Sequence, residues 1–299
     1  MTDRTERAAG GRIELAYEAF GDTDAPPMVL IAGLATQMLG WDDRFCIRLA
    51  DNGCRVNRYD NRDVGRSTHL VDAGTPDIIG LLRGRKRAVP YTLMDMADGT
   101  AGLLDALALE SAHVVGMSMG GMIAQQLAIS HPHRVRSLTS IMSTPSRRSG
   151  RRVGRRSGCC YFHSRPTKRR PPNALRVYRV IGSPGYPLDE RRVADVARRS
   201  FARGSNPAGV ARQYAAIVVS PDRSPGLRKL KVPTLVLHGA EDPLIQVDGG
   251  RATAGAVPGA RFVVFPGMGH DLPQQLWPQL VREIVTHAMS VQPGGATRA

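Results

Sequence analysis

The chain has 299 residues, of which 42% are hydrophobic, enough for one large core or for one core with a modest second module. Its formal net charge is +15, but ten arginines and lysines, with no acid among them, lie between Pro145 and Pro172. This distribution excludes an evenly basic surface and confines the question of a nucleic-acid or lipid partner to that segment. No apolar run reaches the roughly 18 residues of a membrane span, and the first fifteen residues lack a signal-like apolar stretch, so we expect a cytoplasmic protein.

Short apolar or β-branched runs alternate with helical patterns along the chain, which is typical of βαβ units and a mostly parallel sheet. We therefore predict an α/β fold in which helices flank a twisted sheet. The predicted strands are Ile13–Ala19, Met28–Ala32, Arg55–Tyr59, Ala112–Gly116, Arg136–Met142, Pro233–His238 and Arg261–Phe265.

Two helices are predicted between these strands. One begins at Ser118 and ends near Ser130, because the following His131-Pro132 stops a helix. The other helix carries apolar residues near the 3.6-residue spacing of an amphipathic helix: Leu93, Met96, Leu103, Leu104 and Leu107.

The tail from Val291 is rich in small and polar residues and is predicted to be disordered.

The cysteines are predicted to be free thiols. They form no C-x-x-C pair and no metal-ligand spacing, and two of them are sequence neighbours, which is poor geometry for a disulfide. We expect no metal ion and no organic cofactor. The four residues are Cys46, Cys54, Cys159 and Cys160.

The strongest chemical motif is G-x-S-x-G, in which Gly116 and Gly120 flank Ser118 between a predicted strand and a predicted helix. In such a nucleophile elbow the serine occupies a strained turn, and a side chain at either glycine would collide with the neighbouring strand or helix. The serine would also lie at the helix start, where the dipole and free N–H groups favour a developing oxyanion. Because the pattern also arises by chance, its position between strand and helix is what makes Ser118 the predicted nucleophile.

An acid and a histidine follow the last two predicted strands, in the order Ser, Asp, His that is typical of one serine-hydrolase lineage. Asp242 lies in the turn G-A-E-D-P, and His270 lies in P-G-M-G-H-D. Parallel strands end at one edge of a sheet, so both side chains are expected to reach Ser118. We predict His270 as the general base and Asp242 as the residue that orients it.

Other titratable residues near these positions are weaker candidates. Glu241 is the rival acid, but Asp242 directly precedes Pro243 and matches the pattern better. His238 closes a strand and is expected to be buried structure, while Asp271 is expected to start the last helix rather than to tune the histidine. Three further histidines are expected at helix caps or on the surface: His113, His131 and His133.

An oxyanion hole needs two N–H donors, one from the residue after the nucleophile and one from the loop after an earlier strand. Met119 supplies the first. Gly33 follows the strand M-V-L-I and allows a tight fold of the backbone, so that the N–H of Leu34 can face the serine.

These motifs resemble the branch of the α/β-hydrolase fold that contains aclacinomycin methylesterase and related actinobacterial lipases and esterases. The likeness covers about Ile13 to Thr144 and about Leu175 to Ala288. It is carried by I-A-G-L-A-T-Q-M-L-G-W, D-N-R-D-V-G-R-S-T-H-L, V-V-G-M-S-M-G-G-M-I-A-Q and H-G-A-E-D-P-L-I.

The resemblance implies Ser118, Asp242 and His270 as triad, with Leu34 and Met119 as oxyanion donors. The chain differs from many hydrolases of this fold at Ala32, where they carry a histidine that supports the loop. The resemblance also implies a helical cap between the sixth and seventh strands, at residues 145–229, on a core of residues 1–144 and 230–299.

The expected activity is cleavage of a carboxylic ester of a small molecule through an acyl-enzyme. Lactonase, perhydrolase and carbon–carbon bond hydrolase activities use the same triad and remain alternatives, as does a hydrolase-like protein that only binds a ligand or nucleic acid. No obligatory nucleic-acid partner is expected. The sequence predicts neither a particular ester nor an oligomeric state.

The segment 145–172 does not fit a cap, because S-R-R-S-G-R-R-V-G-R-R-S-G-C-C has no apolar stripe and its glycines and arginines oppose a packed helix. We expect this segment to be disordered. Its abrupt start and end between two matching flanks indicate a compensated pair of frame changes, in the gene or in its sequencing. The alternative is a basic arm that binds nucleic acid or acidic lipid.

Overall fold

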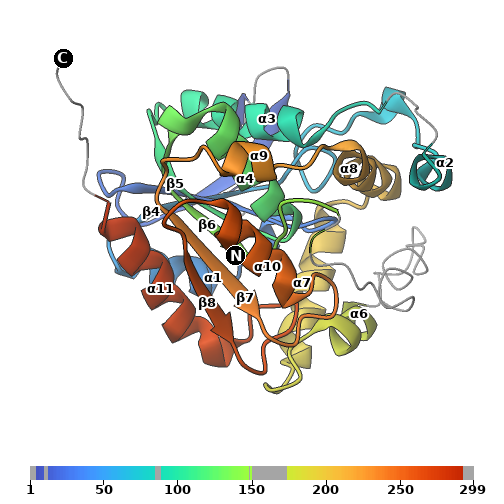
Figure 1. Ribbon diagram of the computed structural model, residues 1–299. Helices are drawn as coiled ribbons and strands as arrows, with labels where there is room; N and C mark the ends of the chain where they lie inside the picture. The colour runs from blue at the N-terminus through green and yellow to red at the C-terminus, as the bar shows by residue number, and fades with distance from the viewer. Residues whose placement is uncertain (1–4, 10–12, 85–88, 148, 150–173, 292–299) are drawn as a thin grey trace, which may run out of the picture.

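The computed structural model describes residues 5–9, 13–84, 89–147, 149 and 174–291 (Figure 1). Within these residues, eight strands form one sheet in the order β1-β2-β4-β3-β5-β6-β7-β8. The strands from β4 to β8 are parallel to one another, while β1 and β2 form an antiparallel edge. Their bounds are Glu6–Ala9, Glu14–Phe20, Pro27–Ile31, Arg55–Tyr59, Ala112–Met117, Val135–Ile141, Thr234–Gly239 and Arg261–Phe265, for β1 to β8.

The structure confirms the predicted α/β class and places all seven predicted strands, each within a residue of its expected bounds. The strand that sequence analysis missed is β1. Its sequence, E-R-A-A, is short and largely exposed and has no apolar alternation. β1 is the edge strand of the sheet and pairs with β2. A strand at the edge can be short and polar, without a hydrophobic face of its own.

Helices cover both faces of the sheet (Figure 1). On one face, α3 and α4 pack with residues of α9 and α10 into one apolar cluster, and on the other face α1 and α11 contribute to a second. The bounds are α1 Asp43–Asp51, α2 Ile78–Leu82, α3 Leu93–Ala106, α4 Met119–Ser130, α6 Ala174–Ile181, α7 Glu190–Arg203, α8 Pro207–Val219, α9 Ser224–Leu227, α10 Val247–Ala256 and α11 Trp277–Met289. Short 3-10 turns occur at η1 Met38–Gly40, η2 Val71–Ala73, η3 Pro132–Arg134 and η4 Gln274–Leu276.

Helix α3 forms where the leucine pattern predicts it. The Thr92 side chain accepts from the Asp95 N–H, and the Asp95 side chain accepts from the Thr92 N–H, which is a capping box. The apolar stripe predicted from the sequence is buried against the sheet through Leu93, Met96 and Leu103. Local capping and long-range burial therefore specify the same helix.

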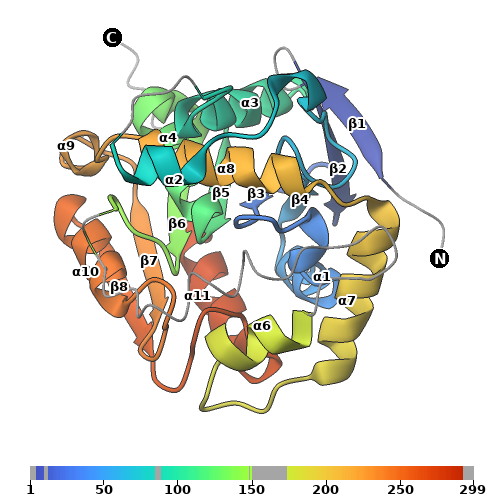
Figure 2. The same cartoon turned by 90° about the vertical axis from the view of Figure 1, so that its right-hand side faces the viewer.

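Helices α6, α7 and α8 lie in the chain between β6 and β7, and α8 crosses in front of the sheet with α6 and α7 below it (Figure 2). Two arginines, the buried Arg212 and the partly buried Arg203, join this layer to the residues after β4. Arg212 of α8 forms a bidentate ion pair with Asp63, at 2.6 and 2.8 Å, and Arg203 of α7 binds Asp60 at 2.6 Å. Gly209 lies so close that a Cβ atom there would be 2.4 Å from the Asp63 carbonyl oxygen. The backbones of α8 and the β4 loop are therefore in direct contact.

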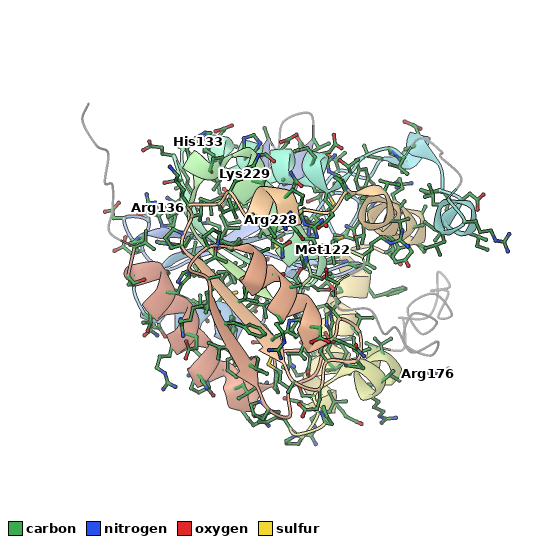
Figure 3. All side chains as sticks on the ribbon, in the orientation of Figure 1. Met122, His133, Arg136, Arg176, Arg228 and Lys229 are labelled. Atoms are coloured by element: carbon green, nitrogen blue, oxygen red, sulfur yellow. The ribbon has the colours of Figure 1, made fainter. Side chains whose placement is uncertain are left out.

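Basic side chains within the described part of the chain are spread over the molecule. His133, Arg136 and Lys229 lie on one side of it, whereas Arg176 of α6 lies on the opposite side (Figure 3). No described helix combines the length and apolarity that crossing a bilayer requires. Most of the arginine-rich segment, and the tail beyond residue 291, lie outside the described residues.

Two predictions about individual side chains have different outcomes. Cys46 and Cys54 are free, as predicted, while Cys159 and Cys160 lie outside the described residues. His113, expected at a cap or on the surface, is instead 3% exposed inside the sheet, where its Nδ1 contacts the Ser137 hydroxyl at 2.8 Å. Burial lowers the pKa of His113 to about 4, so the ring is neutral at pH 7.

Replacing Arg212 by leucine should strongly destabilise the protein, because it leaves the Asp63 carboxylate buried without its counter-ion. We expect the free energy of unfolding in urea to fall by about 3–5 kcal/mol. Arg198→Leu is the matched control, since that side chain is 77% exposed and pairs with Asp195 within its own helix. It should change stability by less than about 0.5 kcal/mol. Equal effects of the two changes would contradict this account of how α8 is attached.

Candidate active site

The backbone at Ser118 is strained where β5 turns into α4. Ser118 has φ +57°, a left-handed conformation that L-residues rarely adopt, and its N–H donates to the Ile141 carbonyl at 2.9 Å. A Cβ atom at Gly116 would lie 2.2 Å from the Gly120 carbonyl oxygen, and one at Gly120 would lie 2.1 Å from that of Ile31. Both glycines are therefore required by close approach of helix and strand, for the reason that the motif predicted.

His270 lies between the other two predicted site residues. Its Nε2 is 3.0 Å from the Ser118 Oγ, and its Nδ1 is 2.7 Å from the Asp242 Oδ2. The three residues follow three parallel strands of the sheet, with Ser118 after β5, Asp242 after β7 and His270 after β8. The structure thus joins the three side chains by two hydrogen bonds, although the serine and the histidine are 152 positions apart in the sequence.

The Asp242 carboxylate is held as an ionised acceptor. It is 4% exposed, and its Oδ1 accepts from the N–H groups of Leu244 and Ile245 at 2.8 and 2.9 Å. Burial alone would raise the pKa of Asp242, but attraction to His270 and hydrogen bonds from His238 and His270 hold that pKa well below its usual range. The carboxylate therefore stays charged and fixes the orientation of the His270 ring.

His238 supports this acid from the strand side. Its ring is 0% exposed, and its Nε2 lies 2.7 Å from the Ile245 carbonyl oxygen and 3.5 Å from the Asp242 Oδ2. The prediction that His238 is buried structure is confirmed, but the sequence did not reveal its contact with Asp242.

The rival candidates point elsewhere. Glu241 is exposed, and its Oε2 accepts from the Gly267 N–H at 2.7 Å rather than from His270. His131 is paired with Asp98 at 2.8 Å, and His133 is exposed in the turn after α4.

The loop after β3 passes beside the serine. A Cβ atom at Gly33 would lie 3.2 Å from the Ser118 Cβ, so a side chain there would crowd the serine. The loop then turns through Ala35 at φ +59°, and the Thr36 N–H closes the turn on the Gly33 carbonyl at 3.2 Å. Leu34 thus lies in the tight turn next to Ser118. Met119 is the first residue of α4, where an N–H has no partner within its own helix.

The histidine loop is held from α6. The His270 N–H donates to the Ile181 carbonyl at 2.7 Å, and the Gly269 N–H donates to the Ser183 hydroxyl at 2.9 Å. That hydroxyl in turn donates to Asp271. Ser183 is a positioning residue that no local sequence signal identified, because it lies in a loop 88 residues from its partner Asp271.

The expectation that Asp271 starts the last helix is wrong. The residue before η4 is Pro273, which makes no side-chain cap, and Asp271 is 7% exposed and bound to Ser183 instead. Burial raises the pKa of Asp271 above its ordinary value, despite the hydrogen bond from Ser183. Through Ser183, the Asp271 carboxyl ties the histidine loop to the loop after α6.

A small cavity of about 30 Å³ lies beside His270, bordered by Trp41, Met117, Leu272 and Trp277. Met122, one turn after Ser118 in α4, is 6% exposed in the interior (Figure 3). The cavity beside His270 is also bordered by Asp42, Arg192 and Asp271, so its lining mixes apolar and charged side chains. Among the described residues, no cluster of three His, Cys, Asp or Glu side chains could hold a metal ion.

The chain belongs to the α/β-hydrolase fold family, whose profile it matches over residues 26–273. One relative is rhodomycin D methylesterase DauP of Streptomyces sp. (strain C5), 28% identical over 304 residues, which cover 92% of this chain and 95% of the relative. A second is 3-oxoadipate enol-lactonase 2 of Acinetobacter baylyi, 26% identical over 242 residues and 80% of each chain. Among solved structures, a thermophilic esterase from Thermogutta terrifontis has a TM-score of 0.75 at 22% identity, over 97% of this chain and all of its own. These likenesses confirm the predicted family and fold.

Asp242→Asn should lower turnover of p-nitrophenyl acetate by about 10²-fold or more, because an amide no longer fixes the histidine tautomer. Glu241→Gln is the matched control, since it alters the neighbouring acid with the same loss of charge. It should leave turnover within about threefold. The reverse result, with a large loss only from Glu241→Gln, would move the acid by one position.

Proposed function

We propose that this chain is a carboxylic-ester hydrolase in which Ser118 is the nucleophile, His270 the general base and Asp242 the residue that orients His270. The observation that carries the proposal is the line of two hydrogen bonds, 3.0 Å from Ser118 to His270 and 2.7 Å from His270 to Asp242. Nucleophile and base within hydrogen-bond reach, with a third group orienting the base, is the arrangement that activates a serine.

In the first half of the reaction, the His270 Nε2 takes the proton of the Ser118 hydroxyl as its oxygen attacks the ester carbonyl carbon. The carbonyl oxygen becomes an oxyanion, which accepts hydrogen bonds from the N–H groups of Leu34 and Met119. His270 then gives the proton to the departing alcohol, and the acyl group remains on Ser118. The ionised Asp242 stabilises the imidazolium throughout this step.

In the second half, a water molecule takes the place of the alcohol. His270 removes one of its protons while the water oxygen attacks the acyl carbon, and the same two N–H donors hold the second oxyanion. Collapse of this intermediate releases the carboxylic acid and returns the proton to the Ser118 oxygen. Every step uses side chains and backbone groups of the chain itself.

The relatives suggest which esters to test first. DauP is by name a methylesterase, which favours a methyl ester of a larger acid. The lactonase relative keeps the cyclic-ester alternative open, because opening a lactone uses the same attack and the same oxyanion. A panel of aromatic methyl esters, p-nitrophenyl esters of rising acyl length and simple lactones would separate the two classes by kcat/KM.

We also propose that residues 145–229 form a cap on a core of residues 1–144 and 230–299. Support comes from α7 and α8, which lie between β6 and β7 in the chain and bind the core through the Arg203–Asp60 and Arg212–Asp63 pairs. Reading the coding DNA of 145–172 in its other two frames tests the frame-change hypothesis: an open frame that encodes an apolar-striped helix supports it, and its absence from both frames rejects it.

Ser118→Ala should lower kcat for the best ester by about 10³-fold or more while leaving the unfolding midpoint nearly unchanged. The change removes one oxygen at the elbow and no packing contact. Ser130→Ala, at the other end of α4, is the control and should retain turnover within about threefold.

Retention of most activity by Ser118→Ala would reject the assignment of the nucleophile. If the wild-type protein hydrolyses no ester or lactone of the panel, the proposed activity is wrong and a protein that only binds its ligand becomes the better account.

A further inference from the structure

We propose that Gln213, on helix α8, is a positioning residue of the oxyanion hole. The inference rests on the proposed function, because it concerns the loop that supplies the Leu34 N–H to the oxyanion. It extends that function because a side chain of the proposed cap would position the loop after β3.

Gln213 is 0% exposed and uses both ends of its side chain. Its Oε1 accepts from the Ala35 N–H at 3.0 Å, and its Nε2 donates to the Arg62 carbonyl oxygen at 2.8 Å. The first contact joins residues 178 positions apart in the sequence. One amide therefore bridges the loop after β3 and the loop after β4.

The Ala35 N–H belongs to the peptide unit that directly follows Leu34. Ala35 has φ +59°, a strained conformation for a non-glycine residue that is kept only where neighbours enforce it. The Gln213 Oε1 fixes the direction of this peptide, and the Thr36 hydroxyl fixes its other end by donating to the Leu34 carbonyl at 3.1 Å. The turn that aims the Leu34 N–H is therefore held from both sides.

The hydrogen bond to Gln213 also keeps the Ala35 N–H from competing with the Leu34 N–H for the oxyanion. With the Ala35 N–H bound to Gln213, the N–H of Leu34 is the one left to face the serine side of the loop. From below, the Asn61 Nδ2 donates to the Ala32 carbonyl at 3.0 Å, which fixes the entry to the turn. Asn61 and Gln213 thus hold the turn from opposite ends.

Gln213 is itself held rigidly. The preceding Arg212 binds Asp63 through two hydrogen bonds, and Gly209, one turn earlier, packs against the Asp63 backbone. The Asn206 side chain donates to the Asp63 carbonyl at 3.2 Å. A side chain on so fixed a helix can define the position of the loop that it binds, rather than follow it.

An amide is the group that this position needs. A carboxylate at 213 could accept from Ala35 but would face the Arg62 carbonyl with no proton to donate, and it would place a negative charge near the oxyanion. An apolar side chain would leave both the Ala35 N–H and the Arg62 carbonyl, which lie in half-buried loops, without their partner. Both replacements should loosen the turn.

The test compares Gln213→Leu with Gln125→Leu by kcat, by KM and by inhibition with octyl trifluoromethyl ketone, which forms an oxyanion adduct with an activated serine. Gln125 is the matched control because it is also 0% exposed and makes two side-chain hydrogen bonds, to Ser140 and Arg223, away from the oxyanion loop. Thermal unfolding of both variants measures the stability that each loses.

For Gln213→Leu we expect kcat to fall about 10- to 100-fold with KM within about threefold, a smaller loss than removing an oxyanion donor outright. The affinity for the ketone should fall by a similar factor. Gln125→Leu should lose comparable stability yet keep kcat and ketone affinity within about threefold. A merely structural role for Gln213 would move the melting temperature alone.

The inference is overturned if Gln213→Leu keeps wild-type kcat, if its loss lies in KM alone, or if ketone affinity is unchanged. If Gln213→Leu does not fold, Gln213→Glu replaces it, since it conserves volume, and we expect the same loss of kcat; wild-type kcat in that variant overturns the inference. Failure here leaves the proposed function standing when Ser118→Ala is inactive, whereas an active Ser118→Ala variant rejects the proposed function itself.

Discussion

The left-handed backbone at Ser118 is the constraint on which the rest of the site depends. It allows a strand to turn into a helix within one residue, and it lifts the serine oxygen out of the sheet edge. The strain is tolerated because Gly116 and Gly120 let β5, α4 and β3 meet with backbone atoms in contact. Once this corner is set, His270 after β8 lies within hydrogen-bond distance of Ser118, Asp242 after β7 binds His270, and the loop after β3 passes beside the serine.

The loops around the serine are held from two sides. On one side, two backbone N–H groups bind the Asp242 Oδ1, while the Oδ2 lies beside the His238 ring and faces His270. From the segment between β6 and β7, Ser183 in the loop after α6 braces the histidine loop, and Gln213 of α8 braces the loop after β3. This segment therefore contacts two of the loops beside Ser118, and changes there should alter turnover as well as substrate selection.

Features that depend on local sequence patterns could be predicted from the sequence, whereas contacts between distant segments could not. The strands and the α3 stripe show in local patterns of apolar residues, and the elbow glycines show in a local motif, and these predictions are confirmed. The line of Ser118, Asp242 and His270 could also be predicted, because parallel strands end at one edge. Gln213 and Asp271 could not, since their partners are fixed by packing between distant segments, and a buried glutamine has no local pattern. The edge strand β1 was not predicted, because backbone pairing with β2 holds it and its side chains show no strand pattern.

Covalent labelling tests the central claim, that Ser118 is an activated nucleophile, most directly. The folded wild-type protein is treated with a fluorophosphonate, digested and mapped by tandem mass spectrometry. We expect one phosphonyl group per chain on the Ser118 hydroxyl, because His270 removes its proton during attack and the Leu34 and Met119 N–H groups hold the phosphoryl oxygen. An unlabelled Ser118, or a label of equal extent on other serines, would contradict the account.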